Sequence, residues 1–211
     1  MRRLLTSKWT KVSVFFICLG PLAYLAWRAL HQDLTANPIE FITHLTGDWT
    51  LRFLLITLAV TPMRSFLQLP DLIRFRRMLG LFAFFYGTLH LTTFVVLDHF
   101  FDWREMLNDV FKRPFITAGF TALMLMLPLA LTSTRGWIRR LGGHRWQSLH
   151  RLIYLSATAG VIHYYWLVKS DIRVPLEYAL ILTTLLLLRV ALWMKRRGKA
   201  SFPLPTSETT V

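Results

Sequence analysis

Long apolar segments dominate this chain and restrict it to folds that cross a membrane. Two of them, 78–97 and 114–134, contain no acidic residue, lysine or arginine. Each is long enough to span a hydrocarbon core of about 30 Å. Because the bilayer core offers no water to unpaired backbone groups, such segments form helices. Four further segments are shorter or carry charges near their ends, and they cover 12–27, 49–70, 152–168 and 174–194. The sequence therefore predicts an all-α polytopic membrane bundle with about six transmembrane helices.

Composition supports this class of protein. Of the 211 residues, 54% are hydrophobic and 17% are charged, which is more apolar than an ordinary soluble domain. The formal net charge of +14 does not indicate a nucleic-acid partner, because the basic residues lie in short runs between apolar segments. Cys18 is the only cysteine, so the chain can form neither an intramolecular disulfide nor a cysteine-based metal cluster.

The distribution of lysine and arginine predicts the orientation of the helices. Loop 31–48 has no lysine or arginine, and the basic residues concentrate in the segments 1–11, 64–77, 135–151 and 189–199. Segments on the cytoplasmic side of a membrane protein carry an excess of these residues. Both termini are therefore predicted to be cytoplasmic. All eight tryptophans also lie near predicted membrane ends, as an interfacial aromatic belt requires.

A single domain is expected to occupy most of the chain. We predict a cytoplasmic N-terminus at 1–11, one transmembrane domain at 12–199 and a flexible cytoplasmic tail at 200–211. A cleavable signal peptide is the alternative interpretation of the basic N-terminus and the apolar segment after it. Segment 12–27 lacks a small-residue cleavage site, which favours a first membrane anchor.

Three histidines are the candidate functional residues. His90 lies thirteen residues after Arg77, and His163 lies twelve after Arg151. At about 1.5 Å per residue, both imidazoles lie roughly 18–20 Å from the cytoplasmic edge. Two neutral imidazoles at matched depth on different helices can bind one haem iron. His150 lies at the cytoplasmic edge, where no histidine near Arg77 matches it.

Two alternatives remain open for these histidines. A histidine in a membrane helix can form a hydrogen bond between helices, or it can relay protons or metal ions. If residues 146–169 form one continuous helix, His150 and His163 lie about 20 Å apart along its axis and roughly 140° apart around it. In that case the two need not serve one pocket. The other histidines are expected at surfaces or interfaces, and these are His31, His44, His99 and His144.

Several motifs resemble the MsrQ family, also called YedZ, which belongs to the ferric-reductase-like transmembrane group. The resemblance extends roughly over 37–192 and is carried by short stretches around the three histidines. These stretches are HLTG at 44–47, RRMLGL at 76–81, TLHLT at 88–92, LGGHRWQSLHRLIY at 141–154 and IHYYWLVK at 162–169.

The resemblance implies a haem b protein of the bacterial inner membrane. Members pass electrons from the quinone pool, directly or through FMN, to MsrP, a periplasmic molybdopterin enzyme that reduces methionine sulfoxide in oxidised proteins. By resemblance His90, His150 and His163 are haem ligands, and MsrP forms a heterodimer with the chain. The wider group has four such histidines in two pairs. The fourth is missing here, so a second haem is left open.

Two other functions compete with this expectation. A stand-alone ferric reductase-type haem protein would need a separate flavin reductase, because loop 135–151 is too short for a flavin and nicotinamide domain. A proton or metal transporter would use the histidines as a relay, but the predicted helices contain few carboxylates. For the electron-transfer subunit, the acidic outer loops 31–48 and 98–109 are the candidate docking surface. We expect charge reversal of Asp102, Glu105 and Asp109 to weaken reduction of the partner.

Overall fold

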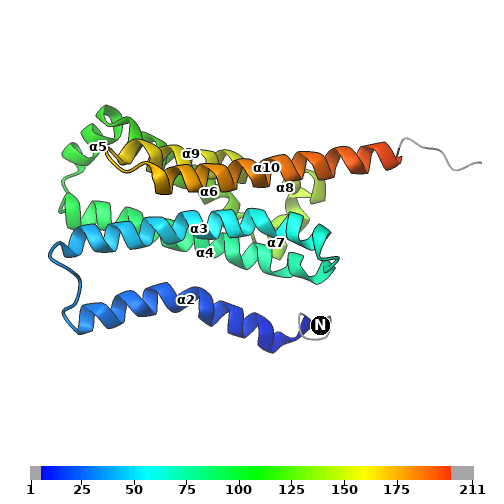
Figure 1. Cartoon of the computed structure of the whole chain (residues 1–211), viewed down its shortest axis with the longest axis horizontal. Helices are drawn as coiled ribbons and strands as arrows, with labels where there is room; N and C mark the ends of the chain where they lie inside the picture. Colours follow the sequence, from blue (N-terminus) through cyan, green and yellow to red (C-terminus); the bar gives the residue numbers. More distant parts are fainter. Residues whose placement is uncertain (1–5, 201–211) are drawn as a thin grey trace, which may run out of the picture.

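The computed structural model describes residues 6–200, and six long helices run side by side in this part of the chain (Figure 1). They are α2 (Lys8–Leu30), α3 (Pro38–Phe66), α4 (Ile73–Thr93), α6 (Pro114–Leu131), α9 (Leu152–Leu167) and α10 (Arg173–Ala200). Shorter elements connect them, namely the 3-10 turn η1 (Pro70–Leu72), the π-helical turn η2 (Phe94–Asp98), α5 (Trp103–Lys112), α7 (Arg135–Leu141) and α8 (Gly143–Leu149). The described residues contain no strand. The all-α prediction is confirmed.

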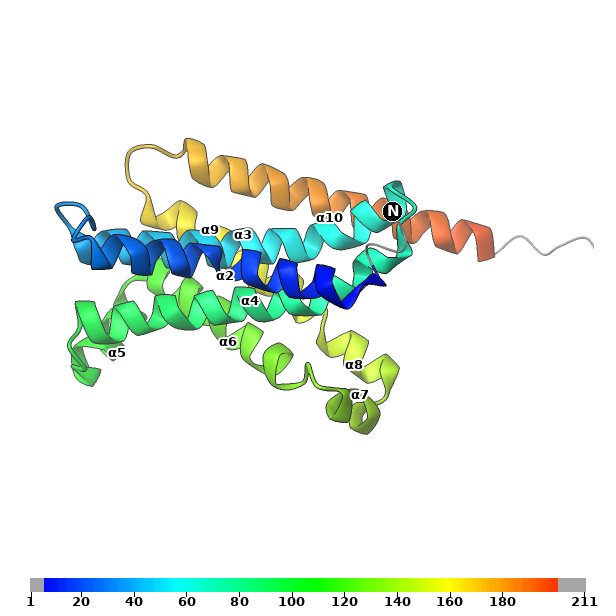
Figure 2. The same cartoon turned by 90° about the horizontal axis from the view of Figure 1, so that it is seen from below.

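The bundle has two distinct ends. The start of α2, the end of α10 and the short helices α7 and α8 lie together, and we call this the terminal end (Figure 2). Helix α5 lies at the opposite end, which we call the α5 end (Figure 1). The basic segments 64–77 and 135–151 both lie at the terminal end. They follow the second and fourth predicted membrane segments, so the chain returns to the same end before each of them. That the terminal end faces the cytoplasm is a prediction of the positive-inside rule.

The chain is a multi-pass membrane protein. Four helical stretches have the length and composition of membrane spans, and these are Lys8–Leu30, Pro70–Asp98, Pro114–Leu131 and Arg173–Lys195. Of the remaining long helices, α9 has only 16 residues, and α3 carries four charged side chains within its 29 residues. Helix α3 packs against α4, α9 and α10, and α9 also packs against α6. Neighbouring helices thus cover part of the charged helix α3 and of the short, apolar helix α9. Six crossings remain a prediction.

Helix α2 is attached to the bundle by one buried tyrosine. The hydroxyl of Tyr86 on α4 donates to the carbonyl of Cys18 at 2.9 Å and accepts from the amide of Leu22 at 3.2 Å. This hydroxyl therefore lies between two groups that an undistorted helix would pair with each other. The ring of Tyr86 also stacks on Phe53 of α3, with centroids 5.4 Å apart. One side chain thus links α2, α3 and α4.

Residues 146–169 do not form one continuous helix, and the predicted membrane segment 152–168 corresponds to α9 (Leu152–Leu167). Helix α8 ends at Leu149 and α9 begins at Leu152, with His150 as the C-cap of α8. The indole of Trp146 donates to the carbonyl of Thr132 at the end of α6, at 2.9 Å. This bond ties α8 back to α6 while α9 enters the bundle. The calculated 20 Å and 140° between His150 and His163 therefore do not apply.

Two predicted segments begin differently in the structure. The second half of the expected outer loop 31–48 is helical, because Asn37 caps α3 by accepting from the amide of Glu40 at 3.3 Å, followed by a proline at the first position. At the N-terminus, α2 already begins at Lys8, inside the segment predicted to precede the membrane. The predicted tail at 200–211 lies outside the described residues except for its first position.

The side chain of Arg189 points into the bundle. Its Nη2 and Nε atoms donate to the carbonyl of Leu58 at 2.7 and 3.2 Å, and Nη1 donates to the hydroxyl of Tyr154 at 2.6 Å. The Leu58 carbonyl needs this partner because the residue four positions later is Pro62, which has no amide hydrogen. A cation on α10 thus satisfies a carbonyl that a proline leaves unpaired on α3.

Arg189→Gln is expected to lower the free energy of unfolding by about 1–3 kcal/mol, because a buried carbonyl loses its donors. In the Arg189→Gln background, Pro62→Ala should restore part of this loss by supplying an amide to Leu58. Unfolding in detergent, measured for both single variants and the double variant, tests this coupling. Strictly additive effects of the two substitutions would show that Arg189 does not act on the carbonyl left by Pro62.

Candidate functional site

His90 on α4 and His163 on α9 meet inside the bundle. The centroids of their rings lie 6.1 Å apart, with an angle of 76° between the ring planes. Of the three histidines proposed from the sequence, these are the two that the structure brings together. The two histidines are 73 positions apart in the chain. His90 contacts a carbonyl of α3, and His163 contacts a carbonyl of α6.

Backbone carbonyls hold both imidazoles. Nδ1 of His90 donates to the carbonyl of Thr43 on α3 at 3.0 Å, and Nδ1 of His163 donates to the carbonyl of Phe115 on α6 at 2.6 Å. A carbonyl can only accept, so each Nδ1 carries the proton. The lone pair of each ring therefore resides on Nε2. Metal-ligating histidines in proteins are held in the same way.

Two glycines make room for these rings. A Cβ atom placed on Gly119 of α6 would lie 2.7 Å from Nδ1 of His163, and one on Gly47 of α3 would lie 3.1 Å from Cε1 of His90. The first distance is shorter than van der Waals contact allows. Glycine at these positions lets each helix backbone approach the imidazole closely enough for the carbonyl bond to form.

Both histidines line a cavity of about 770 Å³. Cavities that bind cofactors and other small molecules measure about 300–1,000 Å³. Much of the wall is apolar and comes from α3, α4 and α6, including Leu51, Leu54, Leu91, Leu123 and Met126.

A haem fits this donor set. His90 and His163 would hold the iron through Nε2, because imidazole is a standard iron ligand in haem proteins. The two ring centroids lie 6.1 Å apart, and both residues line the cavity. The protonated Nδ1 atoms also leave the correct nitrogen of each ring for iron.

A cluster of three side chains, His99, Asp109 and Arg113, lines the cavity at the α5 end and includes the ion pair of Asp109 with Arg113. Nδ1 of His99 donates to the carbonyl of Phe94 at 3.2 Å, and its Nε2 lies 3.3 Å from Oδ2 of Asp109. Oδ1 of the same carboxylate accepts from Nε of Arg113 at 3.1 Å. These contacts join η2, α5 and the start of α6. His99 was expected at a surface or interface; it lies at the α5 end of the bundle, with only 9% of its side chain exposed.

These contacts also change the interpretation of the acidic loop 98–109. Asp109 is buried in the ion pair just described, and Asp102 caps α5 by accepting from the amides of Arg104 and Glu105, both at 3.0 Å. Reversing the charge of either aspartate would break local structure. Glu105 is exposed and lines the cavity, so it is the member of this acidic group that can contact a partner directly.

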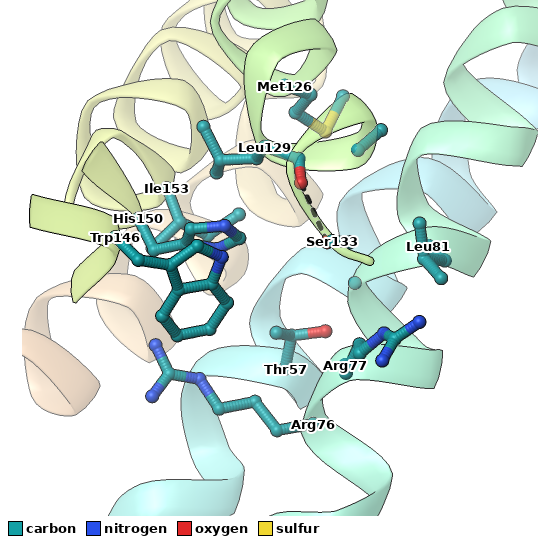
Figure 3. Close-up of a pocket in the computed structure, with 12 residues that line it drawn as sticks. Thr57, Arg76, Arg77, Leu81, Met126, Leu129, Ser133, Trp146, His150 and Ile153 are labelled. Atoms are coloured by element: carbon teal, nitrogen blue, oxygen red, sulfur yellow. Dashed lines mark hydrogen bonds between the residues drawn. The ribbon is translucent and has the colours of Figure 1, made fainter. Parts of the chain in front are cut away.

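His150 lies in a separate, much smaller cavity at the terminal end, of about 70 Å³, together with Arg76 and Trp146 (Figure 3). Its ring stacks on that of Trp146 with centroids 3.9 Å apart, and its Nε2 lies 3.3 Å from Oγ1 of Thr132. Burial and the nearby positive charge of Arg76 lower the pKa of His150 to about 4. The structure does not bring this histidine to His90 and His163.

Sequence reasoning missed the residues that orient the ligands. A glycine in a membrane helix indicates close approach of another helix, and Gly47 and Gly119 carry that signal. The signal does not identify the side chain that approaches. The carbonyls of Thr43 and Phe115 leave no signal in the sequence, because every residue has a carbonyl.

Comparison with known proteins identifies the family. The family described as "Ferric reductase like transmembrane component" matches residues 46–161. Three curated relatives are each named "Protein-methionine-sulfoxide reductase heme-binding subunit MsrQ". The protein from Herminiimonas arsenicoxydans is 54% identical over 94% of this chain and 92% of its own length. The protein from Caulobacter vibrioides is 50% identical over 87% of both chains, and that from Rhodospirillum rubrum is 49% identical over 92% of this chain and 93% of its own. This chain belongs to the MsrQ family, within the ferric-reductase-like transmembrane group.

Proposed function

We propose that this protein is the haem b electron-transfer subunit of a methionine sulfoxide reductase system in the bacterial inner membrane. The observation that carries the proposal is the pair His90 and His163, with centroids 6.1 Å apart and both Nδ1 atoms bonded to carbonyls. The printed names of the relatives, which are heme-binding subunits, support the choice of cofactor.

Bound haem iron would take up and release one electron at a time. His90 and His163 would hold the metal, and the carbonyls of Thr43 and Phe115 accept from their Nδ1 atoms and so orient both rings. The apolar side chains of the cavity exclude water from the cofactor. The identity of the ligands and the exclusion of water would together set the reduction potential of the haem.

The proposed direction of electron flow follows from the position of the cavity. Its lining includes Asp98, His99 and Glu105 at the α5 end, which the predicted topology places in the periplasm. An acceptor there would be a molybdopterin reductase of the MsrP type, forming a heterodimer with this chain. Electrons would enter from the quinone pool, directly or through FMN.

His150 remains a predicted third haem ligand. That role needs a second iron at the terminal end, in a cavity where the described residues provide no second histidine. Counting haem per chain tests it.

The electron-transfer proposal is tested in proteoliposomes that contain the haem-loaded protein. A quinol should reduce the haem, and addition of MsrP with methionine sulfoxide should reoxidise it, as followed by stopped-flow absorbance. MsrP without sulfoxide serves as the control and should support at most the few electrons that MsrP itself stores. A haem that quinol reduces but that MsrP and sulfoxide leave reduced would contradict the assigned acceptor.

Glu105→Lys is expected to slow haem oxidation by MsrP about three- to tenfold at low ionic strength, because it reverses an exposed charge at the mouth of the cavity. The difference should shrink in high salt. Glu105→Gln should have a smaller effect, and haem content should be unchanged in both variants. Equal second-order rate constants for all three proteins at low salt would exclude Glu105 from the docking surface.

A further inference from the structure

The large cavity that holds His90 and His163 has a single strong cation in its wall. Among the lysines and arginines of residues 6–200, only Arg113 lines it. Five carboxylates line the same cavity, and these are Glu40, Asp48, Asp98, Glu105 and Asp109. A cofactor with negatively charged groups would meet repulsion from these carboxylates. Arg113 is therefore the side chain that can compensate such groups.

Arg113 lies close to the contact that orients His163. It is the N-cap residue of α6 and stands two positions before Phe115, whose carbonyl accepts from Nδ1 of His163 at 2.6 Å. Two residues span at most about 7 Å of chain. Because α6 begins at the α5 end (Figure 1), Arg113 borders the proposed haem pocket on that side.

Asp109 holds the guanidinium of Arg113 by one atom only. Nε lies 3.1 Å from Oδ1 of Asp109, whose Oδ2 lies 3.3 Å from Nε2 of His99. Within residues 6–200 neither Nη1 nor Nη2 of Arg113 forms a hydrogen bond. The side chain is 57% exposed, so these groups are accessible. Two parallel N–H groups on a guanidinium match the two oxygens of a carboxylate.

We propose that Arg113 binds a propionate of the haem that His90 and His163 hold, and that this contact fixes the direction of the cofactor in the cavity. The inference rests on the proposed function. Haem is an apolar ring with two propionate carboxylates on one edge. The cavity is divided in the same way, because Leu123 and Met126 lie ten and thirteen positions after Arg113 on α6, about 15–20 Å further toward the terminal end. The propionate edge thus points to the α5 end.

A guanidinium beside a propionate also changes the redox equilibrium. It offsets negative charge next to the iron, and less negative charge favours the ferrous form. Arg113 is therefore expected to raise the midpoint potential of the haem. Asp109 acts as a positioning residue, since it holds the Nε side of the guanidinium.

The test compares haem with haem dimethyl ester, whose esterified propionates cannot form an ion pair. Full-length protein from haem-deficient cells is loaded with either cofactor in detergent, and transfer to excess apomyoglobin is timed. The kinetic phase compared is the one absent from His163→Ala. Arg113→Gln should release haem about three- to tenfold faster than the wild type, a modest factor because the arginine is partly exposed. Both proteins should release the ester at equal rates.

Two further variants and a second readout sharpen this comparison. Lys112→Gln removes the neighbouring exposed cation, which does not line the cavity, and should match the wild type with both cofactors. Arg113→Lys should recover part of the difference, because it keeps the charge but not the fork. With haem, Arg113→Gln should shift the redox equilibrium three- to tenfold toward the ferric form, about 30–60 mV. With the ester, the midpoint potential should not change.

Equal acceleration of release by Arg113→Gln with haem and with the ester would overturn the proposal, because the substitution would then act on helix packing through Asp109. Equal release of haem by the wild type and Arg113→Gln would overturn it too. A wild type that takes up neither cofactor would instead refute the proposed function and, with it, this inference.

Discussion

His90→Ala and His163→Ala should each yield a folded membrane protein with little or no haem. Each substitution removes one of the two proposed iron ligands from a cavity with largely apolar walls. Haem per chain, measured as the pyridine haemochrome against protein concentration, is expected to fall by at least tenfold in both variants. Added imidazole should restore part of the haem, because it fits the space that the side chain leaves.

His44→Ala is the control for this pair. His44 lines the same cavity, but it lies at the exposed end of α3 beside Glu40, 3.8 Å away. The haem content of the His44→Ala variant should match that of the wild type. His150→Ala tests the third predicted ligand, and a partial loss of haem in this variant would support that role. Full haem content in both His90→Ala and His163→Ala would refute the proposed ligand pair.

Gly119→Ala should weaken haem binding about 10- to 100-fold, the range typical of changes that misorient a metal ligand. The new methyl group would lie 2.7 Å from Nδ1 of His163, so the imidazole must move and its bond to the Phe115 carbonyl must lengthen. Gly47→Ala, with a contact of 3.1 Å to His90, should have a smaller effect. Gly20→Ala should have none, because a methyl group added there would meet no heavy atom within 4 Å.

The loss of haem affinity should be largest for Gly119→Ala, smaller for Gly47→Ala and absent for Gly20→Ala, and this order tests contact with the imidazoles. Haem dissociation in the presence of excess apomyoglobin gives the three rates, and thermal unfolding of the haem-free proteins separates ligand displacement from general instability. An equal effect of all three glycine substitutions would show that helix packing alone, rather than contact with the imidazoles, explains the losses.

The sequence predicts the helices well where apolar length is the dominant constraint. The segments 78–97 and 114–134 correspond closely to α4 with η2 and to α6, because a bilayer forces such segments to be helical. Prediction was wrong at the membrane edges, where α3 begins at Pro38 and α8 separates from α9. At those positions a cap or a single indole hydrogen bond decides the backbone path, and hydropathy does not report on either.

The candidate site also has features that the sequence predicts and features that only the structure reveals. Counting residues from Arg77 and Arg151 suggested similar depths for His90 and His163, because depth is a property of each helix alone. The contact between Gly119 and His163 and the bond from Arg189 to Leu58 depend on how helices far apart in the sequence pack. Such contacts require the three-dimensional structure.

The most direct test of the central claim is a dithionite-reduced minus oxidised visible spectrum of the purified wild-type protein, with haem counted by pyridine haemochrome. We expect a sharp b-type spectrum from a haem held by His90 and His163, and the haem count then decides whether His150 serves a second haem. A colourless protein from haem-replete cells would contradict the account, and the two histidines would then be polar packing or transport residues in a cavity that does not bind haem.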